Sequence, residues 1–457
     1  MELQQAVKTF ATAARVRAVD EVLSRRGVKR VRLAGLAGSA PAMLITQLKK
    51  RREPALVIAN DAEQAGYLYS DMAAIAQEGD VAYFPSGFRR HIRFGQPDPA
   101  MQILRAETLD ALRRGTVRWV VTSPDALAEK VPAPELFAER ALDLHTGARM
   151  LRNYAIARLR ELGFKNVDYV YEPGQFAARG SILDIFSFSH ELPYRVDFFD
   201  DEIDSIRTFN VETQLSEEKV ERVTVVPEHD TAREDGLSLP ETLPASTVLY
   251  CQSLHWLETQ LDELCASRLS DSAAIAAEGE TDIERRLADP RAIRKALGGF
   301  RTVEFGPSQG EAADGAVGIT FDCRPQELYH KNFELIAQSF SRFLSDGYKI
   351  FILSDSANQT ERLRAIFAER GDDIPFTPVA RTLHLGFVDT AGKNCYFTDH
   401  QIFDRFHKFA LRSDKARSGK LAMTVKELKR IEPGDFIVHI DQIGRASCRE
   451  RVFWVVV

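Results

Sequence analysis

One stretch in the middle of the chain constrains the fold more than any other. Residues 171–210 read YEPGQFAARGSILDIFSFSHELPYRVDFFDDEIDSIRTFN. Two runs rich in β-branched and aromatic residues, 182–186 and 194–199, are separated by turn residues, and a third run begins at Ile203. Runs of this length with Gly, Pro, Asp and Ser between them are typical of neighbouring antiparallel strands. The stretch therefore predicts a twisted antiparallel sheet.

Arg179 and Gly180 stand where the second strand of this sheet would begin. A glycine at that point permits a bulge or a close backbone approach, which would direct the arginine outward. An acidic cluster follows, at Asp197, Asp200, Asp201, Glu202 and Asp204. The cluster could suggest a metal-dependent nuclease, but no matching array of His or Lys follows, and acidic turns are commonly only solvated.

Helix-like and strand-like segments alternate through the first 125 residues. The helical segments are 10–25, 42–51, 62–76 and 101–112, and the strands are 31–36, 55–59, 80–85 and 117–122. Short apolar strands alternating with helices indicate a parallel sheet with helices on its faces. Residues 229–327 resume this pattern, so we expect their strands to return to the first sheet. The predicted fold class is α/β, with the antiparallel module inserted into the parallel-sheet domain and a small α/β domain after it.

The loop after the first strand reads LAGLAGSAPA at residues 33–42. It lies where a phosphate-binding loop would lie, between a strand and a helix. A working loop of the pattern GxxxxGK[ST] uses backbone N–H groups, a lysine and a hydroxyl that holds magnesium. Two interpretations remain open, a degenerate P-loop or a plain Gly/Ala turn, and neither should hydrolyse ATP.

Composition excludes several other classes of protein. The net charge of −6 gives no global electrostatic case for nucleic-acid binding. No stretch of about 18 apolar residues indicates a membrane span, and we expect a cytoplasmic, soluble protein without a cofactor. The five cysteines have no metal-binding spacing; they are Cys251, Cys265, Cys323, Cys395 and Cys448. His400 and His407 lie two turns apart if their segment is helical, a spacing wider than zinc helices use, so we interpret them as surface or core histidines.

The motifs of the central stretch resemble a known module. Arg-Gly before ILDIF, followed by PYRVDFFDDEID, is similar to the module shared by the excision-repair protein UvrB and the bacterial transcription-repair coupling factors. In both families this module docks the damage-recognition ATPase UvrA. Similar runs occur at VVTSPDAL (120–127) and TDHQIF (398–403), and residues 428–441 resemble the first strand of the coupling factors' barrel that binds RNA polymerase. The chain is identified as similar to the N-terminal part of a transcription-repair coupling factor.

The resemblance implies that the loop at 33–42 is a degenerate P-loop. Set on the UvrB pattern, Pro41 falls where the lysine belongs and Ala42 where the threonine belongs. Proline also removes a backbone donor, and phosphoryl transfer depends on electrostatic positioning that these residues cannot supply. The residues of this loop that we single out are Gly35, Gly38, Ser39, Pro41 and Ala42. No catalytic residue, metal ligand or cofactor is implied for this part of the chain.

The resemblance also implies three residues for the UvrA contact: Arg179, Phe186 and Arg195. An exposed arginine beside an aromatic side chain is a common pairing in interfaces. Phe186 could equally belong to the core, because its strand alternates. Arg195 could instead pair across the sheet with Asp184 or Asp197.

The domains that follow from this resemblance can be given by residue number. They are a UvrB-like domain in two halves (1–135 and 229–327), the inserted UvrA-binding module (136–228), a spacer domain (328–405), a basic linker (406–427) and the start of the polymerase-interacting domain (428–441). Residues 442–457 resemble a translated sequencing adapter, so we expect the encoded protein to be interrupted near Asp441. A barrel cut after one strand should not bind polymerase.

The leading hypothesis is a role in transcription-coupled nucleotide excision repair. This part of the chain would recruit UvrA without enzymatic activity, while RNA polymerase and DNA would be bound by parts that follow it in the family, including a DNA translocase. One alternative is an active UvrB-like nucleotide hydrolase or helicase, against which Pro41 and Ala42 argue. The other is a structural α/β adaptor unrelated to repair, which would not bind UvrA.

Overall fold

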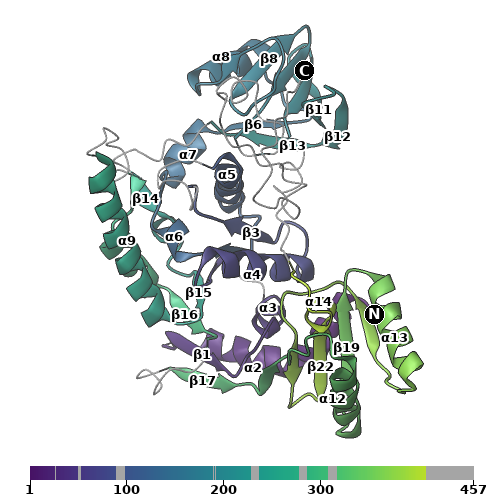
Figure 1. Cartoon of the computed structure of the whole chain (residues 1–457). Coiled ribbons are helices and arrows are strands. Elements are labelled where there is room, and N and C mark those ends of the chain that lie inside the picture. Colours follow the sequence, from purple (N-terminus) through teal and green to yellow (C-terminus); the bar gives the residue numbers. More distant parts are fainter. Residues whose placement is uncertain are drawn as a thin grey trace, which may run out of the picture. The chain divides into compact units, whose positions relative to one another are not determined.

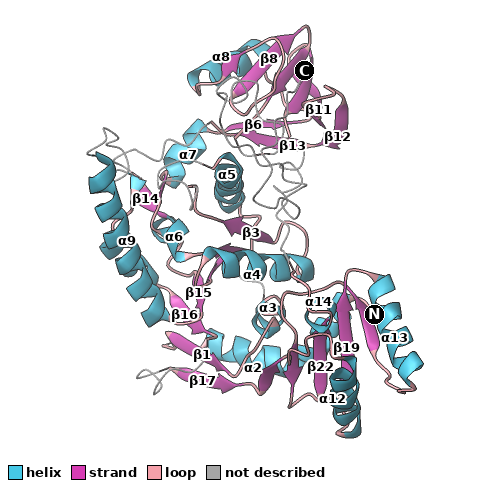
Figure 2. Ribbon diagram, in the orientation of Figure 1, coloured by secondary structure: helices cyan, strands magenta, loops and turns pink. Residues whose placement is uncertain are grey.

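The computed structural model describes residues 1–25, 27–49, 53–88, 98–188, 190, 192–227, 236–276, 286–306 and 316–407. All of these belong to a compact unit that ends at Leu411. The predicted linker from residue 408 onward, the polymerase-domain strand and the adapter-like tail lie outside the described residues. Figure 1 follows the chain by sequence position, and Figure 2 separates helices from strands.

A seven-stranded parallel sheet forms the first domain. Its strands are β1 (Arg30–Ala34), β2 (Ala55–Ile58), β3 (Val81–Phe84), β4 (Trp119–Thr122), β15 (Val248–Cys251), β16 (Arg301–Glu304) and β17 (Val317–Thr320). The order is β17-β1-β16-β15-β2-β4-β3, and every neighbouring pair is parallel. The later strands thus lie in the same sheet as the first four, as the sequence predicted.

Helices and short connecting elements cover both faces of this sheet (Figure 2). They are α1 (Leu3–Phe10), α2 (Ala13–Ser24), α3 (Ala40–Ile45), α4 (Ala62–Ile75), α5 (Pro99–Arg114), α6 (Pro124–Leu127), α7 (Pro134–Arg140), η1 (Leu239–Thr242), α9 (Leu254–Ala276) and α11 (Pro290–Gly299), with the short pair β5 (Lys130–Val131) and β14 (Leu237–Ser238).

Strand side chains alternate between the two hydrophobic cores. Val57 packs into the core with α1 to α4, whereas Leu56 and Ile58 pack into the core with α9 and α11. A parallel sheet buried on both faces needs such continuous apolar strands. Helix α9 runs without a break from Leu254 to Ala276.

A six-stranded sheet forms the middle module. Its strands are β7 (Lys165–Asn166), β8 (Gln175–Arg179), β9 (Ile182–Ile185), β10 (Tyr194–Phe199), β11 (Glu202–Phe209) and β12 (Ser216–Val220). All neighbouring pairs are antiparallel except β7 with β8, which confirms the predicted antiparallel runs. Helix α8 (Arg152–Glu161) and the pair β6 (Leu142–His145) and β13 (Arg222–Val225) complete the module.

Gly180 lies in the turn that joins β8 to β9. Arg179 pairs with Ile182, so only Gly180 and Ser181 form the connection. Gly180 has a φ of +58°, a conformation that suits glycine in a tight hairpin turn. Arg179 is therefore the last residue of β8 and not the first of the next strand.

A five-stranded sheet follows, in the order β18-β21-β22-β19-β20. The strands are β18 (Cys323–Pro325), β19 (Lys349–Ser354), β20 (Thr377–Ala380), β21 (Phe387–Asp389) and β22 (Asn394–Thr398), and the helices are α12 (Phe333–Ser345), α13 (Ala357–Arg370) and α14 (Asp399–Ile402). Helix α14 ends at Ile402, so His400 and His407 do not share a helix face, whereas the burial of His400 fits the interpretation as a core histidine. The two rings nevertheless stack, with centroids 4.4 Å apart.

A buried ion pair joins α2 to the five-stranded sheet. Arg15 donates from Nη1 and Nη2 to the two carboxylate oxygens of Asp389, at 2.8 Å each. The Asp389 side chain has no exposed surface, and that of Arg15 is 19% exposed. Burying an ionised carboxylate is costly unless a cation pairs with it, and Arg15 supplies that cation for Asp389.

We expect Arg15→Met to destabilise the chain by about 3 kcal/mol, because Asp389 would remain buried without its cation. Urea unfolding followed by circular dichroism measures the change. The matched control is Arg294→Met, which removes a partly exposed pair with Asp262 and should cost about 0.5 kcal/mol. Equal effects of the two substitutions would contradict the structural role of Arg15.

Candidate functional site

The two faces of the antiparallel sheet differ in chemistry. One face carries apolar side chains that pack with α8, among them Phe176, Leu183, Ile185 and Val196. Alternate residues point to the other face. There a small apolar cluster of Val170, Ala177, Phe186 and Phe209 adjoins a charged centre. The charged centre is the candidate docking site.

Asp184 is the middle of this charged centre. Its side chain is fully buried, and its carboxylate accepts hydrogen bonds from Arg195 Nε at 2.8 Å and Nη2 at 3.0 Å. Arg179 donates to the same carboxylate from β8. Charge-assisted bonds of this kind offset the cost of burying Asp184. In return, Asp184 fixes the orientation of both arginines.

The two arginines differ in exposure. The side chain of Arg179 is 39% exposed, and its guanidinium lies 4.7 Å from the centroid of the Tyr169 ring. Arg195 is 19% exposed, donates also to the carbonyl of Gln214 at 3.0 Å, and lies over the Phe209 ring. Arg195 thus forms the cross-strand pair with Asp184 that the sequence left open. Arg179 offers more of its guanidinium to a partner.

Phe186 is wholly buried in the small apolar cluster. Of the two interpretations that the sequence allowed, the structure supports the core position. Phe186 therefore cannot touch a partner directly in this conformation. It packs beside the charged centre and supports the strands that carry Asp184 and Arg195.

Strand register brings two further basic residues onto this face. Arg195 lies opposite Arg207 on β11, and Arg207 lies opposite Lys219 on β12. Both Arg207 and Lys219 are exposed. Like charges directly opposite each other destabilise a sheet, so this row favours an acidic partner. The sequence pattern does not reveal this row, because the pairing depends on turn lengths and on an irregularity in β11.

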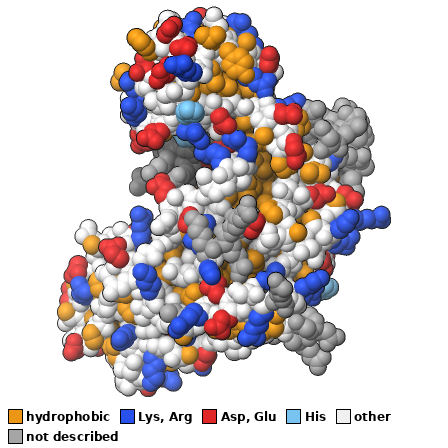
Figure 3. Space-filling view, turned by 180° about the vertical axis from the view of Figure 1, so that it is seen from behind, with side chains coloured by type: hydrophobic (Ala, Val, Ile, Leu, Met, Phe, Trp, Pro, Cys, Tyr) orange, Lys and Arg blue, Asp and Glu red, His pale blue; other side chains and the backbone are white. Residues whose placement is uncertain are grey.

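Charge elsewhere on the surface is mixed. Figure 3 shows acidic and basic side chains interspersed over the visible face. The mixed surface charge agrees with the net charge of −6. The basic row of Arg195, Arg207 and Lys219 is therefore a local feature. A local row suits the docking of a protein better than the long contacts that bind a nucleic-acid backbone.

The loop between β1 and α3 has the geometry of a tight strand-to-helix connection. Gly35 and Gly38 have φ of +76° and +54°. A Cβ on Gly35 would lie 1.9 Å from the carbonyl oxygen of Phe321, and one on Gly38 would lie 2.6 Å from that of Gly386. Glycine is required at both positions. Pro41 lies in the first turn of α3, and Ala42 is fully buried.

Residues 383–386 cover this loop. They are called the 383–386 segment below. The backbone N–H of Ser39 donates to the carbonyl of Leu385 at 3.0 Å, and the N–H of Leu385 donates to Ser39 Oγ at 3.0 Å. Ser39 Oγ in turn donates to Asp71 Oδ2 at 2.5 Å, and the N–H of His384 donates to Asp71 Oδ1 at 2.7 Å. Burial raises the pKa of Asp71, on α4, to about 7.

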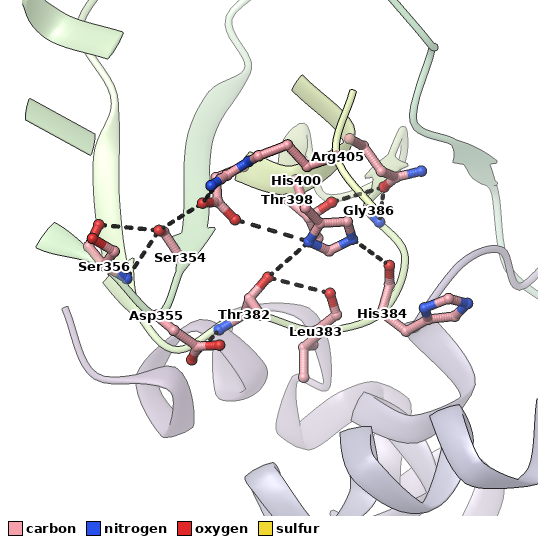
Figure 4. Close-up of polar contacts among 12 residues, drawn as sticks. Ser354, Asp355, Ser356, Thr382, Leu383, His384, Gly386, Thr398, His400 and Arg405 are labelled. Atoms are coloured by element: carbon pink, nitrogen blue, oxygen red, sulfur yellow. Dashed lines mark hydrogen bonds and ion pairs between the residues drawn. The ribbon is translucent and has the colours of Figure 1, made fainter. Parts of the chain in front are cut away.

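Polar contacts behind the segment hold it to the five-stranded sheet (Figure 4). His400 Nε2 lies 2.8 Å from the carbonyl oxygen of His384, and Thr382 donates its N–H to Asp355 at 3.1 Å. The His384 ring stacks on Tyr67 at 3.5 Å, and burial lowers its pKa to about 4. Among the described residues no group of three or more His, Cys, Asp or Glu side chains could hold a metal ion.

Comparison with known proteins gives matches to one family throughout. Residues 142–230 match the UvrB interaction domain. The transcription-repair-coupling factor of Escherichia coli (strain K12) is 32% identical over 204 residues, which are 43% of this chain and 17% of that protein. The Bacillus subtilis (strain 168) protein of the same name is 28% identical over 202 residues, or 44% of this chain and 17% of that protein. The Staphylococcus aureus (strain USA300) protein of the same name is 23% identical over 491 residues, which cover 90% of this chain and 41% of that protein.

These matches confirm the resemblance to the N-terminal part of transcription-repair coupling factors. The chain spans 41% or less of the length of these relatives. In the described part of the chain no helix is both long and apolar enough to cross a membrane.

We expect Asp71 to make stability depend on pH in a way that Asp71→Asn removes. Its folded pKa of about 7 exceeds the unfolded value of about 3.9, so the folded state binds the proton more tightly between these values. The free energy of unfolding of the wild-type chain, minus that of Asp71→Asn, should therefore fall as the pH rises from about 4 to 7. The fall should be at most about 1.4 kcal/mol per pH unit, and the difference should be constant above pH 7.

Urea unfolding across this pH range measures the difference. The control is Asp61→Asn, which changes the same chemical group at the N-cap of the same helix and keeps a capping side chain. Parallel pH profiles for the wild-type chain and Asp71→Asn would contradict a raised pKa at Asp71.

Proposed function

We propose that this chain recruits UvrA in transcription-coupled nucleotide excision repair, as the N-terminal part of a cytoplasmic transcription-repair coupling factor. The observation that carries the proposal is the match of residues 142–230 to the UvrB interaction domain. The whole-chain similarity to coupling factors supports the same role. The docking site would be the charged face of the six-stranded sheet in the module at 136–228.

Arg179 is the leading candidate for direct contact with UvrA. It is held by Asp184 yet is 39% exposed, so it presents an oriented guanidinium. The ring of Tyr169, which is 49% exposed, lies 4.7 Å from the Arg179 guanidinium. Arginine and tyrosine dominate the energetic centres of protein interfaces. Arg195 would act mainly by positioning Asp184, and Arg207 would attract acidic groups of the partner.

The proposal includes no enzymatic activity for this part of the chain. The loop at 35–42 carries neither the lysine nor the hydroxyl of a working P-loop at positions 41 and 42. This argues against the alternative of an active nucleotide hydrolase or helicase. RNA polymerase and DNA would be partners of the protein through parts that begin near residue 428, outside the described residues.

We expect Arg179→Glu to weaken binding to purified UvrA by about 30-fold or more, the effect of losing an energetic centre worth roughly 2 kcal/mol. Titration calorimetry with the full chain measures the affinity. Arg160→Glu is the matched control: it makes the same charge change on α8, which packs on the opposite face of the sheet, and should leave the affinity unchanged.

Two outcomes would count against this docking site. If the folded wild-type chain does not bind UvrA, the structural-adaptor alternative replaces the repair function. If Arg160→Glu weakens binding as much as Arg179→Glu does, the docking face is not the charged one.

We expect Arg207→Glu to act mainly on the association rate. Exposed charges at an interface steer the encounter and lose their effect as salt is added. The rate should fall about tenfold at low ionic strength, and the difference from wild type should shrink as the ionic strength increases. Surface plasmon resonance at several salt concentrations measures both rates. A loss confined to the dissociation rate would place Arg207 inside a desolvated contact instead.

A further inference from the structure

We propose that the loop at 35–39 is a peptide-binding socket whose ligand is the 383–386 segment of the same chain. In this view nucleotides are excluded because the socket is occupied, and not only because Pro41 and Ala42 replace a lysine and a threonine. The proposal does not depend on UvrA recruitment. It assigns a structural use to a loop that has lost its phosphate-binding residues.

The N–H and the hydroxyl of Ser39 in the socket are already bonded to the 383–386 segment. A phosphate-binding loop needs free backbone N–H groups that point at the anion. Here the N–H of Ser39 is taken by the carbonyl of Leu385, and Ser39 Oγ accepts from the N–H of Leu385. The two residues exchange hydrogen bonds much as paired strands do. Carbonyl oxygen thus stands in the position that a phosphate oxygen would take.

The segment also approaches Gly38 too closely to leave room for a ligand. A Cβ at this residue would lie 2.6 Å from the carbonyl oxygen of Gly386 and 2.9 Å from that of Leu385. The backbone of the segment therefore rests directly on the glycine. Such an approach leaves no volume between loop and segment for a phosphate group.

The 383–386 segment is also held in place by hydrogen bonds to other residues of its own domain. The N–H of Gly386 donates to Gln401 at 2.7 Å, and the carbonyl of His384 is bonded by His400 (Figure 4). Asp71 ties both partners together, because its buried carboxylate accepts from Ser39 and from the N–H of His384. The pair of Arg15 with Asp389 joins the same two sheet domains nearby. The socket is thus one of several matched contacts of an intramolecular interface.

The test uses the full chain and two independent substitutions. Pro41→Lys with Ala42→Ser restores the missing cation and hydroxyl, with serine chosen because Ala42 is fully buried. Ser39→Ala removes the side chain that bonds both Leu385 and Asp71. Ser24→Ala is the control, since Ser24 bonds only to the carbonyl of Asp20 on an exposed helix surface. Circular dichroism checks folding in each case.

Titration calorimetry with Mg-ATP is the first measurement. We expect no binding up to millimolar nucleotide for either the wild-type chain or the Pro41→Lys/Ala42→Ser variant. Micromolar binding by this variant while the amides of His384 and Leu385 remain protected would overturn the proposal, because the socket would then be open to nucleotide.

Hydrogen exchange at the segment is the second measurement and does not depend on the first variant folding. In the wild-type chain the amides of Ser39, His384 and Leu385 should be protected. Ser39→Ala should speed exchange at Leu385 about tenfold, as expected for the loss of one hydrogen bond, and Ser24→Ala should not. Unchanged exchange at Leu385 in Ser39→Ala would overturn the proposal, because the segment would then be held without the socket.

Discussion

Burial on both faces of the seven-stranded parallel sheet is the constraint on which the other parts of the structure depend. Four of its strands come from the first 122 residues and three from residues 248–320. The chain between them must leave the sheet and return, so the middle module is an insertion with a sheet and a core of its own. The insertion leaves one face of that second sheet only partly covered by apolar side chains, and this face carries the charged centre around Asp184.

Charge within this module is organised around one buried carboxylate. Asp184 holds Arg195 against the sheet and leaves the Arg179 side chain 39% exposed beside the exposed Tyr169 ring. The same carboxylate therefore stabilises one arginine against the sheet and orients a second, more exposed one. The like-charged row at Arg207 and Lys219 has no such stabilising role in the fold, which is why it is better explained by an acidic partner.

The loop at 35–42 combines a tight strand-to-helix connection with a contact to another part of the chain. Its glycines keep the tight connection that a phosphate-binding loop has, but the neighbouring backbone is that of the 383–386 segment. The resulting contacts at Ser39 and Asp71 join the parallel sheet to the five-stranded sheet. A loop with no lysine at position 41 and no hydroxyl at position 42 can thus still join two domains, because its backbone geometry suits a peptide as well as a phosphate.

Local patterns in the sequence determined the strands and helices, the return of residues 248–320 to the first sheet, and that Pro41 and Ala42 stand where a P-loop would have a lysine and a threonine. These follow from periodicity, turn residues and the chemistry of single side chains, all of which are local. The tertiary structure alone decided that Phe186 is buried, that Arg195 pairs with Asp184, and that Arg207 and Lys219 extend the basic row, because strand register depends on turns and bulges. It also decided that α9 continues to Ala276, that His400 and His407 meet without a shared helix, and that the loop at 35–39 is covered by residues more than 340 positions away. These contacts join residues from two sheets that are far apart in the sequence, and no local pattern encodes them.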